Sequence, residues 1–404
     1  MTERLHRTDP YLLEFDARVV ARRERDGRLA VVLDRTAFYA ESGGQPWDTG
    51  TLGGVDVRAV VEDGEEVLHV LEAPLGADAV HGTVDGARRR DHRQQHHGQH
   101  LLSRAFVEVG PAHTVSFHLG AEVCTIDLDR EVSEAEARAA EERANEVVWE
   151  ARPVGVRTVT RSEALALGVP APDGAGDAIR LVDVPGFDVQ PCGGTHPRST
   201  AEVGVVLVIG REHHKGGTRV RFVCGHRALN ASRAQVSLLD RLGTLLSAAP
   251  QCLPEAVERA LGQAAAADRR SRDLLERALE GEARRLLSAP YERPAGAPRD
   301  APRVVVTAYD AWPASDLRSL AAHLVRLEPC LALLGSRAEK AHLVFAQTPG
   351  LPHDVPGLLS QAAGRLGGRG GGRGDVAQGG GQNVDRLDEA LQLAARAALR
   401  NAGE

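Results

Sequence analysis

The sequence predicts an α+β protein with several domains, on three observations. Residues 1–86 consist mostly of short strand-like segments, leucines recur at helical spacing from Ala228 to about Leu287, and strands alternate with helices after residue 302. A chain of 404 residues has room for two to four domains, and a hydrophobic share of 42% is enough for packed cores.

The N-terminal strands are expected at Leu12–Ala21, Arg28–Asp34, Val55–Val61 and Glu66–Leu71. Between the second and third of these lies a turn-rich segment, Thr36–Gly50. Within it, Gly43-Gly44 permits positive φ angles and the close approach of another backbone. The segment is either a corner of a barrel or a loop that delivers Gln45 and Asp48 to a site.

A helix is predicted over residues 87–110, with Asp85 or Asp91 as its cap. Gly110-Pro111 should end this helix. Arg88-Arg89-Arg90 opens it, although three cations at a helix N-terminus oppose the helix dipole. These arginines form either a solvated face or a phosphate contact.

The middle of the chain should contain a strand pair, a helix that Ser133 and Glu136 start as a capping box, and a later hairpin. The expected elements are strands at 114–120, 123–128, 153–160 and 179–184, helices at 132–151 and 161–168, a Pro/Gly/Asp loop at 169–178, and hairpin strands Val203–Gly210 and Thr218–Cys224.

From Ala228 to Leu287 the pattern predicts two long helices or a coiled-coil hairpin, broken near Pro250 and Pro254. A proline-rich linker should follow at 289–302. The last part then resembles a small α/β domain. Its expected elements are strands Arg303–Thr307, Cys330–Gly335 and Lys340–Ala346, and helices Ala314–Leu324, Val355–Leu366 and 384–402.

A glycine-rich stretch, residues 367–381, lies between the last two of these helices. It is either a flexible linker or a cationic loop with an exposed backbone. Arg369 and Arg373 lie in it, and Arg365 comes just before, which favours contact with nucleic-acid phosphates.

Composition excludes several classes of protein. The five cysteines are odd in number and scattered, which argues against a disulfide framework and for a reducing, cytoplasmic compartment. The sequence contains no signal peptide and no apolar run near the roughly 20 residues of a membrane span. The net charge of −7 does not by itself indicate a nucleic-acid binder.

Histidines cluster in the helix predicted over residues 87–110. His92, His96 and His100 are spaced i, i+4, i+8 and therefore share one helix face. Imidazoles one turn apart are a common pair of Zn²⁺ ligands. The pairs that fit are His92/His96, His96/His100 and His97/His100, and the second of these adjoins the buried edge formed by Leu101-Leu102.

A second half-site follows at Cys192-Gly193-Gly194-Thr195-His196, where a tight turn offers a thiolate and an imidazole together. Two such pairs brought together by folding would complete a tetrahedral zinc shell. The remaining cysteines, which lack a histidine four positions away, are expected to be structural: Cys124, Cys224, Cys252 and Cys330. Whether the zinc is structural or catalytic stays open.

Five motifs in a particular order resemble a known family. They are Gly43-Gly44-Gln45-Pro46 with Asp48, Gln95-His96-His97-Gly98-Gln99-His100-Leu101-Leu102, Thr114-Val115-Ser116-Phe117-His118, Cys192-Gly193-Gly194-Thr195-His196, and the closing Ala377-Gln378-Gly379-Gly380-Gly381. Together they resemble the long form of the alanyl-tRNA editing proteins, which are freestanding relatives of the editing and C-terminal parts of alanyl-tRNA synthetase.

The resemblance implies four parts. They are a small N-terminal β-barrel domain at 1–86, a zinc-containing α+β editing domain of the threonyl/alanyl-tRNA synthetase type at 87–228, a helical connector at 229–290, and a C-terminal α/β domain of the DHHA1 type at 291–404. The last would bind tRNA or form a homodimer. The aminoacylating core is absent, so the resemblance implies no ligase activity.

The metal ligands that the resemblance implies are His96, His100, Cys192 and His196, with Zn²⁺ as the cofactor. The implied reaction is hydrolysis of Ser-tRNA(Ala), with Gly-tRNA(Ala) as a second substrate. Gln45 would line the pocket, and Thr114 or Ser116 would bond the substrate's serine hydroxyl. Such a polar pocket rejects alanine, which leaves buried polar groups unpaired.

Two residues depart from the family's pattern. His97 stands where a small Thr or Ser is usual, so it either alters the pocket or serves as an alternative ligand. Gly374 stands where proline is more common, which should loosen the loop before Asp375. Two other functions compete with editing: a non-catalytic tRNA-binding protein with structural zinc, and a zinc hydrolase acting on a small molecule.

Overall fold

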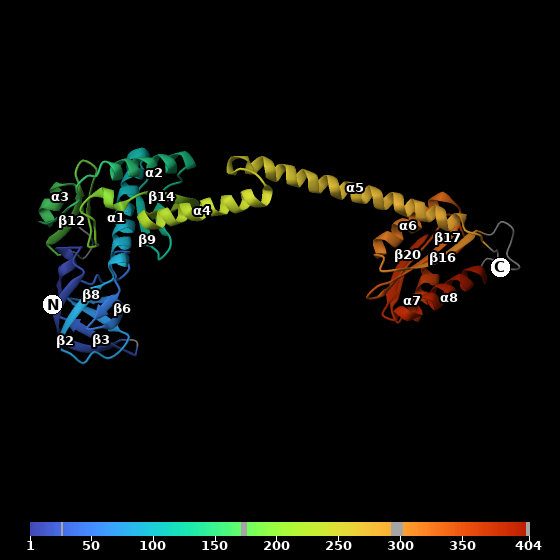
Figure 1. Ribbon diagram of the computed structural model, residues 1–404, viewed down its shortest axis with the longest axis horizontal. Coiled ribbons are helices and arrows are strands. Elements are labelled where there is room, and N and C mark those ends of the chain that lie inside the picture. Colours follow the sequence, from blue (N-terminus) through green and yellow to red (C-terminus); the bar gives the residue numbers. More distant parts are fainter. Residues whose placement is uncertain (26, 171–175, 292–301, 401–404) are drawn as a thin grey trace. The chain divides into compact units, whose positions relative to one another are not determined.

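The computed structural model describes residues 1–25, 27–170, 176–291 and 302–400. The chain is a mixed α+β protein that divides into two compact units, Met1–Leu245 and Leu246–Glu404 (Figure 1). Parts of three expected elements lie outside the described residues: positions 171–175 of the Pro/Gly/Asp loop, 292–301 of the linker, and 401–402 of the last helix. No helix among the described residues is both long and apolar enough to cross a membrane.

The first unit begins with six strands that pair in a closed ring, in the order β2-β3-β7-β6-β5-β8, because β8 pairs back onto β2. They are β2 (Glu14–Arg25), β3 (Arg28–Leu33), β5 (Gly50–Leu52), β6 (Val55–Asp63), β7 (Glu66–Leu71) and β8 (Ala79–Val84). The sequence predicts β2, β3, β6 and β7, but it predicts neither the three-residue strand β5 nor β8. Two short strands, β1 (Glu3–Arg4) and β4 (Arg35–Thr36), pair beside the ring, and the 3-10 helix η1 (Leu5–Arg7) lies between them in sequence.

The rest of the first unit contains two sheets, ordered β14-β15-β10-β9 and β11-β12-β13. Its strands are β9 (Thr114–Leu119), β10 (Cys124–Leu128), β11 (Gly155–Thr160), β12 (Ala178–Val184), β13 (Asp188–Pro191), β14 (Val206–His214) and β15 (Gly217–Cys224). Its helices are α1 (Gly86–Val109), α2 (Glu134–Trp149), α3 (Arg161–Ala166), η2 (Thr200–Val203) and α4 (Gly225–Leu246).

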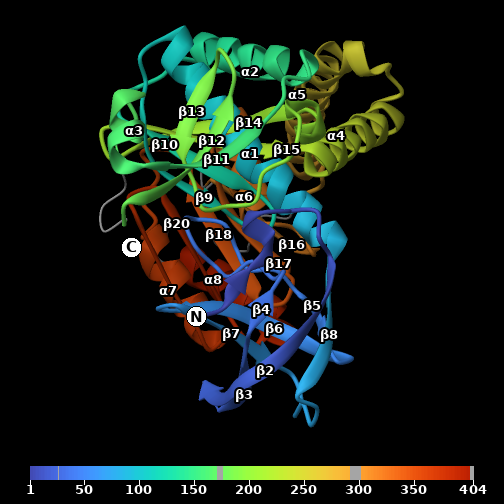
Figure 2. The same ribbon diagram turned by 90° about the vertical axis from the view of Figure 1, so that its left-hand side faces the viewer.

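Helices α1 and α2 pack together and share one hydrophobic core with the four-stranded sheet (Figure 2). Leu102 and Phe106 of α1, Ala140 of α2, and Ile126 and Phe222 of the sheet are all buried in this core. The apolar stripe of α1 therefore faces the sheet, and the orientation of its histidines follows from that.

Both helices begin as their sequences predict. The Asp85 side chain caps α1 by accepting hydrogen bonds from the backbone N–H groups of Ala87 (3.0 Å) and Arg88 (3.1 Å). Ser133 and Glu136 form the capping box of α2. The predicted starts of both helices are thus confirmed.

The second unit is built on a five-stranded sheet ordered β16-β17-β18-β20-β19, in which β16 and β17 are parallel and the other pairs antiparallel. Its strands are β16 (Arg303–Asp310), β17 (Cys330–Arg337), β18 (Ala341–Gln347), β19 (Arg369–Arg373) and β20 (Val376–Gly381). Its helices are η3 (Pro250–Cys252), α5 (Leu253–Ser288), α6 (Ala314–Leu327), α7 (Val355–Arg365), η4 (Val384–Arg386) and α8 (Leu387–Arg400).

Residues of the central strands alternate between two cores. Leu333 and Phe345 pack with α7 and α8 on one face, whereas Leu334 and Val344 pack with α6 and the end of α5 on the other. The near-continuous apolar run of β17 is therefore typical of a strand covered on both faces.

The glycine-rich stretch is a β-hairpin, so its interpretation as a flexible linker or open loop is wrong. Gly372 pairs with Ala377 and Gly370 with Gly379 between β19 and β20. A Cβ at Gly372 would lie 2.1 Å from the backbone oxygen of Val376, so glycine is needed for the strands to approach. Gly374 has a φ of +60° in the turn, a conformation that proline cannot adopt.

Candidate metal centre and its cavity

The first half of the candidate centre comes from α1. His96 and His100 lie one turn apart on the helix, both buried, with ring centroids 5.2 Å apart. Their Cα positions are set by the α1 backbone and by the packing of the neighbouring Leu101 and Leu102, which are fully buried. Two ligand groups are therefore held on a rigid element.

The second half comes from the loop after β13. The Sγ atom of Cys192 lies 3.4 Å from Nε2 of His96 and 3.1 Å from Nε2 of His196. Ligand atoms of His96, His100, Cys192 and His196 all lie within 4.8 Å of one another. Folding thus brings together the two half-sites predicted from the sequence, and the group could hold a metal ion.

Gly194 lets this loop lie directly on the His96 ring. A Cβ at this position would be 2.2 Å from Cε1 of His96, whereas a Cβ at Gly193 would meet nothing within 4 Å. The second of the two glycines is therefore required for close approach, and the first is not required by any contact of this kind.

Hydrogen bonds behind the centre orient its imidazoles. Nδ1 of His96 lies 2.8 Å from Oε1 of Gln45, which also accepts the backbone N–H of Thr195 (3.0 Å). Because a carboxamide oxygen only accepts, the His96 proton lies on Nδ1 and its Nε2 lone pair faces Cys192. Behind His100, Nδ1 lies 3.7 Å from Oδ2 of Asp188, which is within ion-pair range but too long for a hydrogen bond. Such outer partners are typical of metal-binding histidines.

The donor set fits a thiophilic divalent cation. Burial by itself would raise the pKa of the Cys192 thiol, but the imidazoles of His96 and His196 lower that pKa well below its ordinary value, which favours the thiolate. Burial lowers the pKa of His196 to about 3, so this ring is neutral. A tetrahedral zinc site with Zn–S and Zn–N bonds of normal length places S and N about 3.5 Å apart, close to both observed separations.

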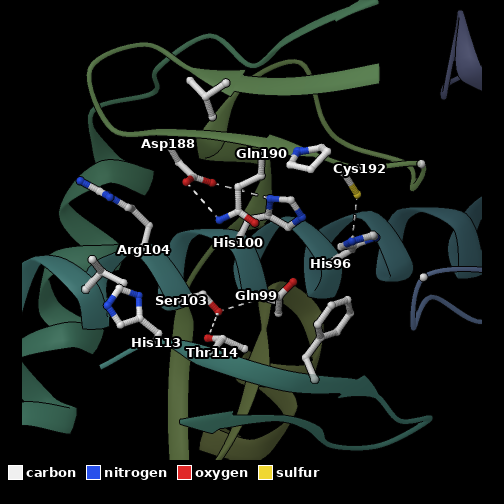
Figure 3. Close-up of a pocket in the computed structure, with 16 residues that line it drawn as sticks. His96, Gln99, His100, Ser103, Arg104, His113, Thr114, Asp188, Gln190 and Cys192 are labelled. Carbon is white, nitrogen blue, oxygen red and sulfur yellow. Dashed lines mark hydrogen bonds and ion pairs between the residues drawn. The ribbon is translucent and has the colours of Figure 1, made fainter. Parts of the chain in front are cut away.

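Three members of the group, His96, His100 and Cys192, line one wall of a cavity of about 620 Å³ (Figure 3). Its lining residues are Gly43, His96, Gln99, His100, Ser103, Arg104, Val107, His113, Thr114, Phe117, Asp188, Val189, Gln190, Pro191, Cys192 and Gly193. A cavity of this volume is in the range that holds a small ligand or the end of a larger one.

A second group of polar side chains lies beside the imidazoles in this cavity. Oγ of Ser103 accepts hydrogen bonds from Oγ1 of Thr114 (2.7 Å) and from Nε2 of Gln99 (2.9 Å). Oε1 of Gln99 is buried and has no hydrogen-bond partner within the described residues. The cavity is therefore lined by hydroxyl groups, and the unpaired oxygen of Gln99 lies just beneath its surface.

Two of the expected site residues lie elsewhere than predicted. Ser116 is absent from the cavity lining and donates to Oδ2 of Asp127 (2.6 Å), after a β-bulge that shifts the register of β9 and β10. Gln45 is fully buried behind His96 and does not line the cavity. It reaches the centre through the His96 ring only.

Three residues of the site were missed by sequence reasoning: Gln99, Ser103 and Asp188. Gln99 and Ser103 are one turn apart on α1, so helical spacing beside His96 and His100 was a usable signal. Asp188 is brought to His100 by β13, and its position four residues before Cys192 carries no such signal.

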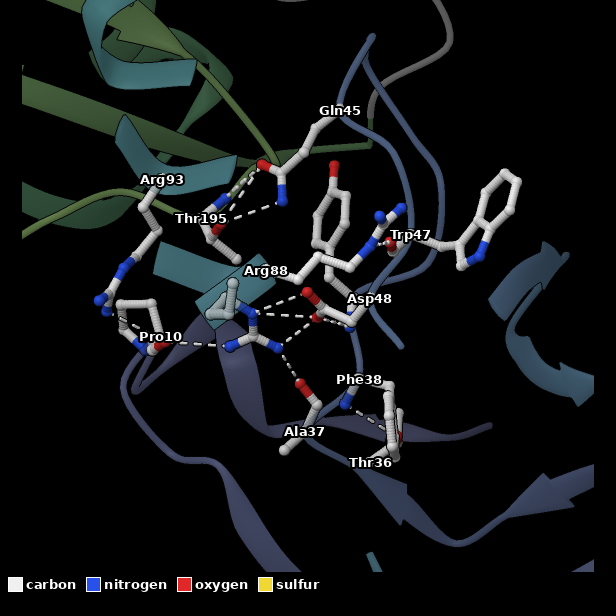
Figure 4. Close-up of polar contacts among 12 residues, drawn as sticks. Pro10, Thr36, Ala37, Phe38, Gln45, Trp47, Asp48, Arg88, Arg93 and Thr195 are labelled. Atoms are coloured by element: carbon white, nitrogen blue, oxygen red, sulfur yellow. Dashed lines mark hydrogen bonds and ion pairs between the residues drawn. The ribbon is translucent and has the colours of Figure 1, made fainter. Parts of the chain in front are cut away.

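Gln45 and Asp48 of the Thr36–Gly50 segment reach different partners (Figure 4). Gln45 reaches His96, whereas Asp48 accepts hydrogen bonds from the guanidinium of Arg89, including one of 3.0 Å from Nε. Arg89 also donates to the backbone oxygens of Pro10 (3.0 Å) and Ala37 (2.6 Å) and is fully buried. Arg89 is thus neither on a solvated face nor available to phosphate.

In the second unit, the three arginines expected to contact nucleic acid are exposed. Arg365 ends α7, and Arg369 and Arg373 lie at the two ends of β19. Positions four apart on a strand share one face, so the last two form a cationic pair on the edge strand of the sheet.

Three family models match the chain. Residues 179–223 match the threonyl and alanyl tRNA synthetase second additional domain, residues 11–86 match the class II (A) tRNA synthetases, and residues 302–399 match the DHHA1 domain. Fold and site thus define a protein related to class II tRNA synthetases, with the second additional domain carrying the Cys192 half of the candidate metal centre.

The relatives narrow this class. The alanyl-tRNA editing protein AlaX-L of Pyrococcus horikoshii is 31% identical over 394 residues, which cover 94% of each chain. The chain belongs to the family of alanyl-tRNA editing proteins, as its motifs predict.

Longer relatives also match. The alanine–tRNA ligase of Natronomonas pharaonis is 34% identical over 417 residues, which cover 97% of this chain but 43% of the ligase. The chain thus spans less than half the length of such ligases. Of solved structures, the C-Ala domain of Aquifex aeolicus alanyl-tRNA synthetase aligns with 26% of this chain and 98% of its own, at 22% identity and a TM-score of 0.24, a likeness too low to carry an argument.

Proposed function

We propose that the protein is a zinc-dependent aminoacyl-tRNA hydrolase that removes serine from mischarged tRNA(Ala), with Gly-tRNA(Ala) as a second substrate. The observation that carries this proposal is the group of three imidazoles and one thiolate, of which His96, His100 and Cys192 line the 620 Å³ cavity. The family membership supports tRNA(Ala) as the nucleic-acid part of the substrate, and the cavity has room for an aminoacylated adenosine.

His96, His100, Cys192 and His196 would hold the zinc. Zn²⁺, when bound, supplies a Lewis acid for the ester carbonyl and its attacking water. Gln45 and Asp188 keep the imidazoles of His96 and His100 turned toward the group.

Selection of serine would rest on Thr114, Ser103 and Gln99. These side chains form one hydrogen-bonded group in the cavity, with the Gln99 carboxamide oxygen free to accept the hydroxyl proton of a seryl ester. An alanyl ester has no hydroxyl and would leave this buried acceptor unpaired, which costs about 1–3 kcal/mol. Alanyl-tRNA(Ala) would therefore be spared, and Gly-tRNA(Ala), which also lacks the hydroxyl, would be a poorer substrate than Ser-tRNA(Ala).

The other parts of the chain have supporting roles in this proposal. We interpret the closed ring of strands as the expected barrel domain (1–86), followed by the editing domain (87–228), the connector (229–290) and the DHHA1-type domain (291–404). Arg365, Arg369 and Arg373 would contact the tRNA backbone, and the last domain could also form a homodimer. The compartment would be the cytoplasm.

A second candidate is a non-catalytic tRNA-binding protein with a structural zinc. It is favoured by the number of ligands, because four protein ligands close the shell of a tetrahedral zinc, as in structural sites. This candidate predicts zinc uptake and tRNA binding with no hydrolysis.

The deciding experiment is deacylation of Ser-, Gly- and Ala-tRNA(Ala) by the purified full chain, with zinc content measured in parallel. Cys192→Ala should lose the metal and at least 100-fold in kcat/KM on Ser-tRNA(Ala), while Cys252→Ala, at an exposed position, should change neither. A Cys192→Ala protein that is fully active without zinc would reject the role of the metal. Wild-type protein that binds zinc and tRNA but hydrolyses no ester would favour the second candidate.

A further inference from the structure

His97 is a buried imidazole beside the metal centre that the proposed reaction does not use. It lies next to His96 on α1 and is 0% exposed. It is not one of the four residues whose ligand atoms lie within 4.8 Å of one another. Its ring is instead turned to His196, with the two Nδ1 atoms 3.1 Å apart, so a role as an alternative ligand finds no support in this geometry.

The Nδ1–Nδ1 contact requires one proton between the two rings. In a hydrogen bond between neutral imidazoles, one nitrogen donates and the other accepts. Nε2 of His196 lies 3.1 Å from Sγ of Cys192 and needs its lone pair to bind a metal ion. The His196 proton must then lie on Nδ1, and Nδ1 of His97 must accept it.

This assignment leaves the other ring nitrogen of His97, Nε2, as a buried donor without a partner in the described part of the chain, which costs free energy. With Nδ1 as an acceptor, the proton of His97 lies on Nε2, which is buried and has no hydrogen-bond partner within the described residues. An unpaired buried donor costs about 1–3 kcal/mol. His97 does not itself line the cavity, so its role should lie in its contact with His196.

Acceptor oxygens also lie behind the other two imidazole ligands, one at hydrogen-bond distance and one at ion-pair distance. Oε1 of Gln45 lies behind Nδ1 of His96, and Oδ2 of Asp188 lies behind Nδ1 of His100. His97 supplies the third acceptor, behind Nδ1 of His196. Each of the three imidazoles thus has an outer partner, and His97 is the partner that comes from the same helix as two of the ligands.

We propose that His97 is a positioning residue that fixes the tautomer and ring plane of His196 by accepting its Nδ1–H, so that Nε2 of His196 is presented to the metal ion. The proposal rests on the zinc centre of the proposed function but not on the reaction. An outer partner of this kind changes metal affinity by about 10–100-fold. His97 therefore belongs to the metal site, although it touches neither metal nor substrate.

Three variants test the proposal by zinc affinity, measured by competition with a chromophoric chelator. His97→Leu fills a similar volume without an acceptor and should weaken zinc binding by about 10–100-fold. His97→Asn carries a carboxamide oxygen that can accept the Nδ1–H of His196 and should recover most of this loss. His92→Leu is the matched control, because His92 is buried on the same helix, is not one of the four ligands, and has no hydrogen-bond partner at Nδ1 within the described residues; it should bind zinc as the wild type does.

Cobalt substitution gives a second readout that does not depend on activity. The Co²⁺ protein should show thiolate charge-transfer and d–d bands of a tetrahedral site, and His97→Leu should shift the d–d bands whereas His97→Asn should restore them. Imidazole nitrogen NMR of the zinc-loaded wild type adds a test without substitution: Nδ1 of His196 should carry a proton and Nδ1 of His97 should not.

The outcomes separate this proposal from the proposed function. Wild-type zinc affinity and an unchanged cobalt spectrum in His97→Leu, or a proton on Nδ1 of His97 in the NMR measurement, would overturn the positioning role even if Ser-tRNA(Ala) is hydrolysed. Loss and recovery of zinc affinity as described would support it even if the wild type hydrolyses no ester. Wild-type protein that takes up no zinc would overturn both.

Discussion

At the level of single residues, the candidate centre depends on Gly194, because this position has no room for a side chain. The Cys192–His196 loop contacts the His96 ring through Gly194, whose absent Cβ would otherwise lie 2.2 Å from Cε1 of His96. The imidazole cannot move away, because Gln45 holds its Nδ1 at 2.8 Å. The loop or the ring must therefore shift if any side chain is added.

Gly194→Ala should accordingly weaken zinc binding by at least 10-fold and lower deacylation in proportion. The reason is a displaced Cys192 or His96, since ligand positions must be held to about 0.5 Å. Gly193→Ala is the matched control, because its Cβ would meet nothing within 4 Å. Chelator competition on both variants checks this, and equal affinities for the two would contradict the steric account.

The sequence offers two hydroxyls for serine recognition, those of Thr114 and Ser116, and substitutions should distinguish them. Thr114→Val keeps the shape of the side chain but removes the hydroxyl that bonds Ser103 in the cavity. It should lower kcat/KM for Ser-tRNA(Ala) by about 10–100-fold, the range for one hydrogen bond to a buried polar group. Zinc content should stay unchanged.

Ser116→Ala should leave this rate within about two-fold, because Ser116 donates to Asp127 outside the cavity. Both variants need only steady-state kinetics on Ser-tRNA(Ala). A larger effect at Ser116 than at Thr114 would show that the wrong strand position has been assigned to substrate recognition.

At the level of elements, α1 is the part on which the first unit depends most. One face packs on the four-stranded sheet, another carries two of the metal ligands, and its first turns bind the N-terminal segment. The contact with the N-terminal segment is made mainly by Arg89, which is buried and donates hydrogen bonds to Asp48, Pro10 and Ala37.

Asp48→Asn should therefore destabilise the first unit by about 3–5 kcal/mol, because it leaves the buried guanidinium of Arg89 without a counter-charge. Chemical denaturation followed by circular dichroism measures this. Glu72→Gln is the control, because its pairs with Arg28 and Arg58 are exposed, and its effect should be small. Equal effects of the two substitutions would exclude a special role for burial of the Arg89–Asp48 pair.

The β19–β20 hairpin shows how an element can be misjudged from composition. A run of glycines with arginines is typical of flexible or phosphate-binding loops. Here the glycines lie in paired strands and allow the neighbouring backbone to come close. A Cβ at Gly370, for example, would lie 2.8 Å from Cα of Gly379. No local pattern distinguishes these cases, because the need for glycine arises from the partner strand.

At the level of the whole molecule, the metal centre and the exposed arginines belong to different compact units. The proposed hydrolysis needs only the first unit, whereas Arg369 and Arg373 are on an edge strand of the second. Affinity for tRNA and the chemical step should therefore respond to different substitutions.

The double variant Arg369→Glu, Arg373→Glu should raise KM for Ser-tRNA(Ala) several-fold while leaving kcat and zinc content unchanged. The loss of phosphate contacts should also reduce the salt dependence of binding, by about 0.7–0.9 in the log–log slope for each lost contact. Filter binding at several salt concentrations measures this. An unchanged slope would assign these arginines a role other than tRNA binding.

The sequence by itself determined the features that depend on neighbouring residues. Capping groups at Asp85 and Ser133, the i, i+4 pair His96/His100 and the Cys192–His196 turn all follow from spacing within one or two turns of the chain. The order of the motifs also indicated the family of alanyl-tRNA editing proteins, because five such patterns rarely occur in the same order by chance.

The tertiary structure alone decided which of these patterns meet. Cys192 reaches His96 across 96 positions and Gln45 reaches Thr195 across 150, and such pairings arise from the packing of sheets and helices rather than from any local spacing. The same packing turned Ser116 away from the cavity through one β-bulge and set His97 against His196. Local sequence specifies backbone conformation at short range, whereas the contacts of a buried side chain depend on every element packed around it.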